Sequence, residues 1–173
     1  FAKLMRQVLN NSKDNFVSLE EEVDTLKNYL ELQKVRFQDK LEYQIEIDPD
    51  LEIDELAIPP MFAQPFIENS LEHGIKHKEE KGTIKIKFYQ KDEKYLVFEV
   101  EDDGIGLEKS ETINAQNTKK HQSMATQITK NRIELLNKRF NLSVKFDISP
   151  IINEENDTQT GTRVWFLVPF KYL

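Results

Sequence analysis

The chain has no cysteine, and only three of its 173 residues are histidine. Without cysteine, neither a disulfide scaffold nor a thiolate metal site is possible. The three histidines, His73, His77 and His121, are too few for us to expect a histidine metal cluster. No apolar run approaches the roughly 18 residues of a membrane helix, and no signal-peptide pattern opens the chain.

Positive charge is also scarce, because 24 Lys and Arg face 31 Asp and Glu and leave a net charge of −7. Nucleic-acid surfaces need a basic patch, which no segment supplies, so we expect no nucleic-acid partner. A polyanion could still bind where backbone N–H groups, lysines or a metal ion neutralise it. The length suits one domain plus an appendage. Because the chain opens on Phe1 rather than Met, we expect a piece of a longer protein.

Two helices are predicted at the start of the chain. Residues 1–9 have apolar side chains at helical spacing, and a second helix runs from Ser18 to about Phe37. Ser18 stands three residues before Glu21, which is the spacing of a capping box. The apolar stripe of this second helix is narrow, so we expect the helix to pack against a partner helix rather than in a core. The pattern favours neither an intramolecular hairpin nor packing between subunits. The stripe is Leu19, Val23, Leu26 and Leu30.

The rest of the chain mixes strands and helices. After residue 41 the hydrophobic period changes to two, and a polar stretch without periodicity, residues 107–122, is a candidate lid. The final run, residues 164–168, is apolar on both faces, which predicts a central strand. The order predicts an α+β fold in which helices cover one face of a largely antiparallel sheet. The expected elements are strands at 41–47, 83–89, 95–102, 142–148 and 164–168, and helices at about 61–73 and 123–140.

One short helix carries polar groups in line with aromatics. Pro65 is tolerable only in a first turn, so the helix should begin near Met61. Gly74 suits a left-handed residue just past its end. Asn69 and His73 share a face, at helical spacing, with Phe62 and Phe66. A buried amide without a partner costs about 1–3 kcal/mol, so these side chains either bond to nearby backbone or meet a ligand.

A second candidate lies at the end of the strand over residues 95–102. Asp102 is in phase with the apolar residues Leu96, Phe98 and Val100, so its carboxylate should point inward. Gly104 and Gly106 follow, and they are two of only five glycines in the chain. Glycine permits sharp turns and close approach of backbone to a ligand. An ordinary solvated turn would explain one glycine, but it would explain neither the second glycine nor the inward orientation of Asp102.

This combination resembles the ATP-binding domain of sensor histidine kinases, which belongs to a group shared with DNA gyrase, the ninety-kilodalton heat-shock chaperone and MutL. It is most similar to the LytS/YehU type, whose Gln-Pro-x-x-Glu-Asn-x-x-x-His-Gly helix is matched by residues 64–74. Residues 6–37 are similar to the linker helices of that family. The resemblance covers essentially the whole chain. It implies a Bergerat-type two-layer fold over residues 39–173, preceded by dimerisation or linker helices over residues 1–38.

The resemblance also implies roles for individual residues, with ATP and Mg²⁺ as the cofactors. Asn69 would bind the Mg²⁺ that bridges the phosphates, and an amide oxygen suits that hard cation. Asp102 would accept a hydrogen bond from the adenine amino group. His73 would support the geometry of the site. The residues expected near the base, ribose or phosphates are Gly104, Gly106, Gly161, Thr162, Ser123 and Lys130.

The chain departs from the family pattern at several positions. Residues 123–126 hold Ser-Met-Ala-Thr where the family has a glycine-rich loop, and Ile128 replaces an Asn. Glu72 stands where a basic residue is often found, so Lys76 or Lys78 could substitute. Gyrase-like members carry a catalytic Glu where this chain has Pro65, which leaves Glu68 as the candidate base and favours transfer to histidine over hydrolysis.

By this resemblance the chain is the catalytic part of a bacterial two-component kinase that phosphorylates a histidine on a helix before residue 1. The implied partners are a second copy in the full-length protein and a response regulator. The fragment would be cytoplasmic, and its parent would be anchored in the membrane through other segments. One alternative is a degenerate nucleotide-binding or dimerisation module without phosphotransfer. Another is a hydrolytic clamp.

Overall fold

The computed structural model describes residues 16–38, 40–60, 63–106 and 130–173, apart from breaks at 132, 136, 139–140 and 154–157 and the side chains of Pro65, His73 and Thr158. Its described residues from 130 to 138 are helical. The predictions for residues 1–9 and 107–122 lie outside this range. The helical elements are α2 (Leu19–Arg36), α3 (Gln64–Asn69), a π-helical turn η1 (Ser70–Gly74) and a 3-10 turn η2 (Ile75–His77). The strands are β1 (Val17–Ser18), β2 (Leu41–Ile47), β3 (Leu56–Ile58), β4 (Gly82–Gln90), β5 (Tyr95–Asp102), β6 (Lys145–Asn153), β7 (Thr158–Pro169) and β8 (Lys171–Tyr172).

Five strands form one sheet in the order β2-β4-β5-β7-β6. Only the β2–β4 pair is parallel, and the other three pairs are antiparallel. The predicted α+β fold with a mixed, largely antiparallel sheet is therefore confirmed, and β7 has strands on both sides as its apolar faces predicted. A small second sheet, β1-β3-β8, was not predicted, because its strands span only two or three residues.

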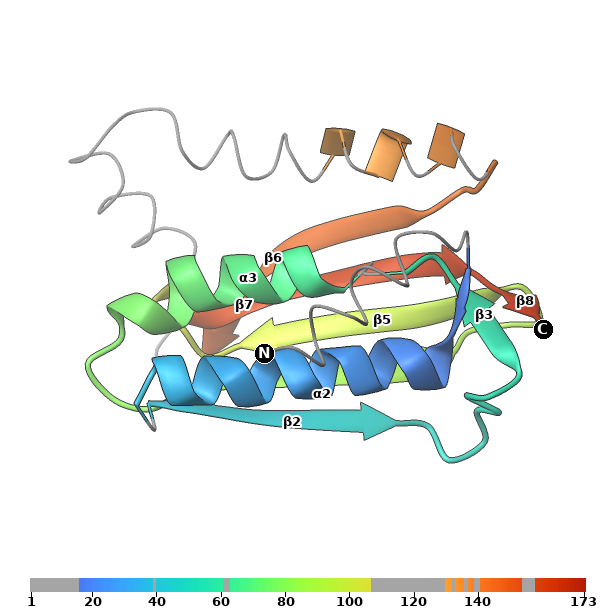
Figure 1. Ribbon diagram of the computed structural model, residues 1–173. Coiled ribbons are helices and arrows are strands. Elements are labelled where there is room, and N and C mark those ends of the chain that lie inside the picture. Colours follow the sequence, from blue (N-terminus) through green and yellow to red (C-terminus); the bar gives the residue numbers. More distant parts are fainter. Residues whose placement is uncertain are drawn as a thin grey trace.

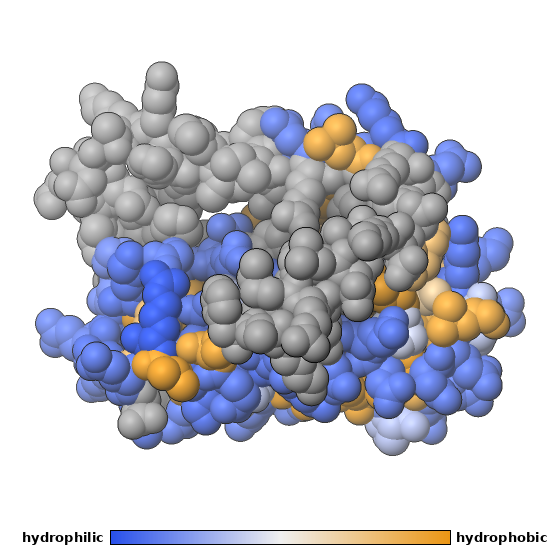
Figure 2. All heavy atoms as spheres, viewed as in Figure 1, coloured by the Kyte–Doolittle hydropathy of each residue, from blue (hydrophilic) through white to orange (hydrophobic). Residues whose placement is uncertain are grey.

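Helices α2 and α3 lie side by side over one face of the large sheet (Figure 1). Helix α2 begins as predicted: the Glu21 N–H donates to Ser18 Oγ at 3.1 Å, and the Ser18 N–H donates to Glu21 Oε2 at 3.3 Å. A cap of this kind is worth about 1 kcal/mol. On the helix-bearing side, the described surface is mainly hydrophilic, with hydrophobic residues in small separate groups (Figure 2).

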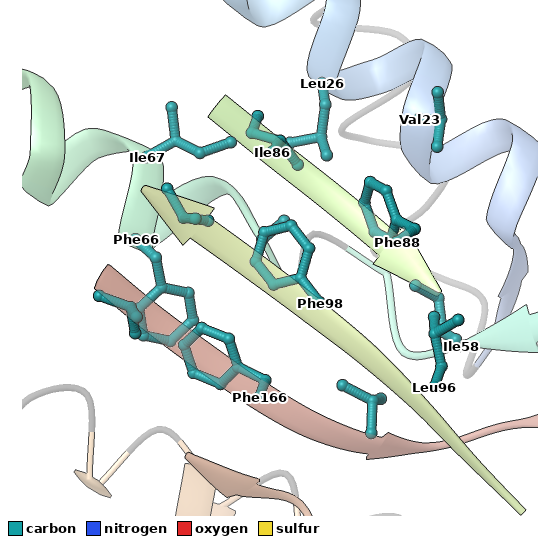
Figure 3. Packing of buried hydrophobic residues seen from close by; sticks show 14 of the residues in the cluster. Val23, Leu26, Ile58, Phe66, Ile67, Ile86, Phe88, Leu96, Phe98 and Phe166 are labelled. Atoms are coloured by element: carbon teal, nitrogen blue, oxygen red, sulfur yellow. The ribbon is translucent and has the colours of Figure 1, made fainter. Parts of the chain in front are cut away.

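The hydrophobic core fills the space between these helices and the sheet (Figure 3). Phe66 of α3 packs on Phe166 of β7 with ring centroids 4.0 Å apart, and Phe98 lies 5.7 Å from Phe166. Such aromatic pairs add about 0.5–1.5 kcal/mol each beyond the area they bury. This packing fixes α3, and the residues that follow it, against the middle strands of the sheet.

The expectation that α2 avoids a core is wrong. All four residues of its apolar stripe are at most 1% exposed and join the same core cluster as the sheet residues. A narrow stripe suffices here because the sheet presents a broad apolar face, which a facing helix would not. The domain boundary after residue 38 stays a prediction, although side chains on both sides of it share one core.

Among the described residues, no helix combines the length and apolar character needed to cross a membrane.

Candidate nucleotide site

Asp102 ends strand β5 and points into the protein, as its phase predicted. The residue is 4% exposed, and its register partner on β7 is Thr162. Burial raises the pKa of its carboxyl to about 6; hydrogen bonds from the Ser70 side chain and from backbone N–H groups of Gly104 and Thr162 act in the opposite direction. The Gly104 N–H lies 3.0 Å from Asp102 Oδ1. Near neutral pH the site therefore holds a buried carboxylate with oriented donors around it.

Glycines surround this carboxylate because backbone must approach it closely. A Cβ on Gly104 would lie 2.6 Å from the carbonyl carbon of Gly74, and one on Gly161 would lie 2.9 Å from the carbonyl carbon of Asp102. These positions leave no room for a side chain. Gly106 has a φ of +80°, a conformation that glycine adopts without strain. Gly104 and Gly161 thus meet around Asp102, with Gly74 as an unexpected member, whereas the atoms nearest a Cβ on Gly106 belong to Gln159.

The prediction that Gly74 is left-handed is wrong. Its φ of −96° and ψ of −71° are right-handed, because the chain continues from η1 into η2 instead of ending there. Glycine is needed here for space: a Cβ at Gly74 would lie 2.8 Å from Asp102 Oδ1 and 3.5 Å from the Cα of Gly104. The helix itself begins at Gln64 rather than near Met61, which puts Pro65 in its first turn as expected.

The π-helical turn η1 connects the two predicted motifs. Ser70, the first residue of η1, is 6% exposed and donates a side-chain hydrogen bond to Asp102. Asn69 directly precedes it as the last residue of α3. Single π-helical turns frequently occur at functional sites. Sequence reasoning missed Ser70, and the only available signal was its position beside Asn69.

The side-chain amide of Asn69 has no hydrogen-bond partner among the described residues. This side chain is partly buried. The alternative that Asn69 bonds to nearby backbone is therefore not seen. The backbone of His73 lies in η1, and its side chain is outside the described residues. An uncommitted amide oxygen beside a buried carboxylate site fits a hard cation such as Mg²⁺.

Glu68 is exposed, and its carboxylate accepts a hydrogen bond from within α3. Gln64 Nε2 donates to Glu68 Oε1 at 2.9 Å. Burial, followed by the negative charge of Glu68, raises the pKa of Tyr29 on α2, so the phenol stays protonated. Tyr29 was not singled out from the sequence, since α2 and α3 are far apart in the chain.

The lysines considered as phosphate partners are paired with carboxylates. Lys76 Nζ lies 2.7 Å from Glu72, and Lys78 Nζ lies 3.0 Å from Asp103. Lys130 is exposed, and among the described residues no contact joins it to Asn69 or Asp102. Ser123 lies outside the described residues. The structure therefore brings together Asp102, Gly104, Gly161 and Thr162. Asn69 lies next to Ser70 in the chain, and the roles of Glu68, Asn69, Ser123 and Lys130 stay predictions.

Comparison with known proteins gives the family. Residues 58–172 match the model of the histidine kinase-, DNA gyrase B- and HSP90-like ATPases, and residues 1–41 match a histidine kinase model. The sensor protein LytS of Staphylococcus epidermidis is 28% identical over 172 residues, which cover 98% of this chain and 27% of LytS. The chain thus spans about a quarter of the length of that relative.

Solved structures show the same fold. The catalytic domain of the histidine kinase ThkA aligns with a TM-score of 0.57 at 15% identity, covering 89% of this chain and 94% of that one. Full-length ShkA in complex with AMPPNP aligns with a TM-score of 0.57 at 16% identity, covering 99% of this chain and 36% of that one. The chain belongs to the histidine kinase-, DNA gyrase B- and HSP90-like ATPase family, and over almost its whole length it is similar to sensor proteins LytS.

Proposed function

We propose that this chain binds Mg-ATP and transfers the γ-phosphoryl group to a histidine. The observation that carries the proposal is the packing of η1 against the buried Asp102: a Cβ at Gly74 would lie 2.8 Å from Asp102 Oδ1, and η1 directly follows Asn69, whose amide has no hydrogen-bond partner among the described residues. One short stretch of backbone thereby places a carboxylate suited to a base and an amide suited to a metal ion beside each other.

Asp102 would recognise the adenine. An ionised carboxylate accepts a hydrogen bond from the exocyclic amino group of adenine, whereas guanine offers a carbonyl oxygen at that position and would be rejected. Burial increases the discrimination against guanine, because leaving a carboxylate unpaired in a low-dielectric site costs more free energy than leaving it unpaired in water. Gly104, Gly106, Gly161 and Thr162 would leave room for the base and ribose around it.

Asn69 would hold the metal through its amide oxygen. Mg²⁺ takes few protein ligands and fills its octahedral shell with water and phosphate oxygens, so a single amide is sufficient. When bound, the ion would neutralise charge on the phosphates. His73 would support the geometry of the turn, and Ser123 and Lys130 would face the phosphates.

In the transfer step the bond between the γ-phosphorus and the β–γ bridging oxygen breaks, and a bond from an imidazole nitrogen to that phosphorus forms. ADP leaves with the bridging oxygen, and the proton of the imidazole passes to a base, for which Glu68 is the candidate. None of His73, His77 and His121 resembles the family's acceptor, so we assign the acceptor to another segment of a longer, membrane-anchored parent. A dimer partner and a response regulator would complete the pathway.

Isothermal titration of Mg-ATP against the chain and its Asp102→Asn variant tests the binding step. We expect the variant to lose at least about tenfold in affinity, because its amide NH₂ faces the amino donor of adenine. Asp147→Asn, which removes an exposed carboxylate on β6, is the control and should bind as the wild type does. Equal affinity of the wild type and Asp102→Asn would exclude the adenine role.

Transfer is tested by adding labelled ATP and a fragment that carries the kinase histidine helix. Label on the histidine supports a kinase. An unlabelled helix despite tight ATP binding would instead identify a nucleotide-binding module without phosphotransfer, and steady phosphate release by the chain alone would identify a hydrolytic clamp.

A further inference from the structure

Asp103 lies between two residues of the nucleotide site, Asp102 and Gly104. The regular pairing of β4 with β5 ends at the Ile84–Asp102 pair. One residue further on, the Asp103 N–H donates to the Thr83 carbonyl at 3.2 Å, and the Thr83 N–H donates to Asp103 Oδ1 at 2.7 Å. The turn that follows β5 is therefore tied to β4 through both the backbone and the side chain of Asp103.

The second oxygen of the same carboxylate pairs with a lysine from the helical segment. Lys78 directly follows η2, and its Nζ lies 3.0 Å from Asp103 Oδ2. The side chains of Lys78 and Asp103 are 23% and 45% exposed. Partial burial of this kind reduces the screening of the pair by water and salt. One carboxylate thereby joins three segments: β4, the turn after β5 and the end of η2.

This ion pair lies beside a very close backbone contact of the site. Gly74, the last residue of η1, packs so tightly on Gly104 that a Cβ on Gly104 would lie 2.6 Å from the Gly74 carbonyl carbon. Two glycines have no side chains with which to hold each other at this distance. The backbone hydrogen bond from the Ile105 N–H to the Gly74 carbonyl is long, at 3.5 Å. The ion pair joins the residue next to Gly104 to a residue about one helical turn beyond Gly74, so it holds the two backbones against each other.

We propose that Asp103 is a positioning residue: its carboxylate fixes the turn that directs Asp102 toward the adenine. The inference rests on the proposed function, in which Asp102 recognises the base. Lys78 then serves the site through Asp103 and is not a phosphate partner. Changes at Lys78 and Asp103 should therefore weaken the binding of AMP, ADP and ATP by the same factor.

The test compares Asp103→Ala with Asp92→Ala. Asp92 lies before β5, as Asp103 lies after it, and its Oδ1 accepts the Lys94 and Tyr95 N–H groups at 2.9 Å each. Both changes remove a carboxylate that accepts backbone N–H groups at an end of β5, so Asp92→Ala is the matched control. Titration calorimetry in EDTA measures the affinities for AMP, ADP and ATP, and competition with ADP measures that for GDP. Denaturant unfolding establishes that each variant is folded at the temperature of the titration.

For Asp103→Ala we expect the affinity to fall by about tenfold for all three adenine nucleotides, the scale of one lost hydrogen bond to a charged group. The preference for ADP over GDP should fall as well, because a carboxylate that is no longer directed at the base discriminates less well. A loss of stability alone would leave that preference unchanged. Asp92→Ala should bind all the nucleotides as the wild type does.

An affinity and a preference for adenine that Asp103→Ala retains would overturn the inference and leave the proposed function standing. An equal loss in Asp92→Ala would also overturn it, since it would show that β5 has loosened as a whole. If the wild type binds none of the adenine nucleotides, the proposed function fails, and the inference fails with it.

A second pair of variants tests the ion pair and keeps the test decisive if Asp103→Ala does not fold. Lys78→Met removes the cation and leaves the hydrogen bond from Thr83 to Asp103 in place. Its control is Lys85→Met, because Lys85 Nζ pairs with Glu46 at 2.8 Å across β2 and β4. We expect Lys78→Met to lose about threefold in affinity for AMP, ADP and ATP alike, and Lys78→Arg, which keeps the cation, to bind as the wild type does. A loss that grows with the number of phosphates would identify Lys78 as a phosphate partner and contradict its role through Asp103.

Discussion

The two sides of the site are built differently. Around Asp102, glycine backbone packs against glycine backbone at the ends of sheet strands, and the polar contacts come from residues beside the site. Around Asn69, a short helix is held at its start by Glu22 of α2, which accepts a hydrogen bond from the Ala63 N–H. The side proposed to bind adenine therefore has the rigidity of the sheet, whereas the side proposed to bind the metal depends on contacts that single side chains make. Substitutions should separate the two.

The largest effect is expected from Gly104→Ala. The added Cβ would overlap the backbone of Gly74, whose carbonyl carbon lies 2.6 Å away and cannot yield as a flexible side chain would. Either η1 or the end of β5 must shift, so we expect a loss of about 3 kcal/mol in the free energy of unfolding and loss of ADP binding. Denaturant unfolding and calorimetry measure both.

Glu80→Ala is a matched control, because it adds no atoms and lies on an exposed bend. Its unfolding free energy should stay within about 0.5 kcal/mol of wild type. If the Gly104→Ala protein were as stable as this control, the backbone around Asp102 would be less rigid than the contrast between the two sides of the site implies.

The next effect concerns the charge of Asp102. Its pKa in the folded protein is about 6 against an ordinary value of 3.8, so the fold favours the protonated carboxyl by about 3 kcal/mol. Stability from this group is present at low pH and is lost as the pH rises through about 6. At pH 7.5 we therefore expect the ATP-free Asp102→Asn variant to be about 1–3 kcal/mol more stable than wild type, although it binds ATP less well.

The measurement is denaturant unfolding of both proteins between pH 7.5 and pH 4. The advantage of Asp102→Asn should shrink as the pH falls and Asp102 takes up its proton. A difference that does not change with pH would show that burial does not raise the pKa of this carboxyl. The combination of higher stability and weaker binding marks a residue whose charge serves the ligand rather than the fold.

Much of the adenine side was predictable because its signals are local. The inward phase of Asp102 follows from the period of two along one strand, and the capping box of α2 from a three-residue spacing. The error at Gly74 has a physical cause. Its small size makes room for Asp102, which the sheet brings beside it. The sequence alone does not distinguish a glycine that is needed for space from one that is needed for a left-handed backbone. No local pattern predicts such contacts.

The metal side was less predictable for the same reason. The pattern of α2 predicted a helix but not what it packs against, so its role in the core was missed. The hydrogen bonds from the Ala63 N–H to Glu22 and from Arg36 to Glu72 join α2 to residues far away in the sequence. No local pattern shows that α3 lies beside α2 (Figure 1).

The smallest effect is expected at the end of α2. Arg36 pairs with Glu72 at 2.7 Å, but the two side chains are 57% and 34% exposed, and pairs of this kind contribute about 0–1 kcal/mol. Lys76, then Arg36, lower the pKa of Glu72, so the contribution is present near neutral pH and is lost as the pH falls through the folded-state pKa.

Arg36→Gln should therefore cost less than about 1 kcal/mol in the free energy of unfolding at low salt and still less at high salt, where exposed charges are screened. Lys27→Gln, which removes another exposed cation of α2 paired with Asp24 at 3.9 Å, is the control. Denaturant unfolding at two salt concentrations measures both. If Arg36→Gln costs well over 1 kcal/mol at both salt concentrations while Lys27→Gln does not, the Arg36–Glu72 pair contributes more than exposed ion pairs ordinarily do, and η1 depends on the end of α2 for its position.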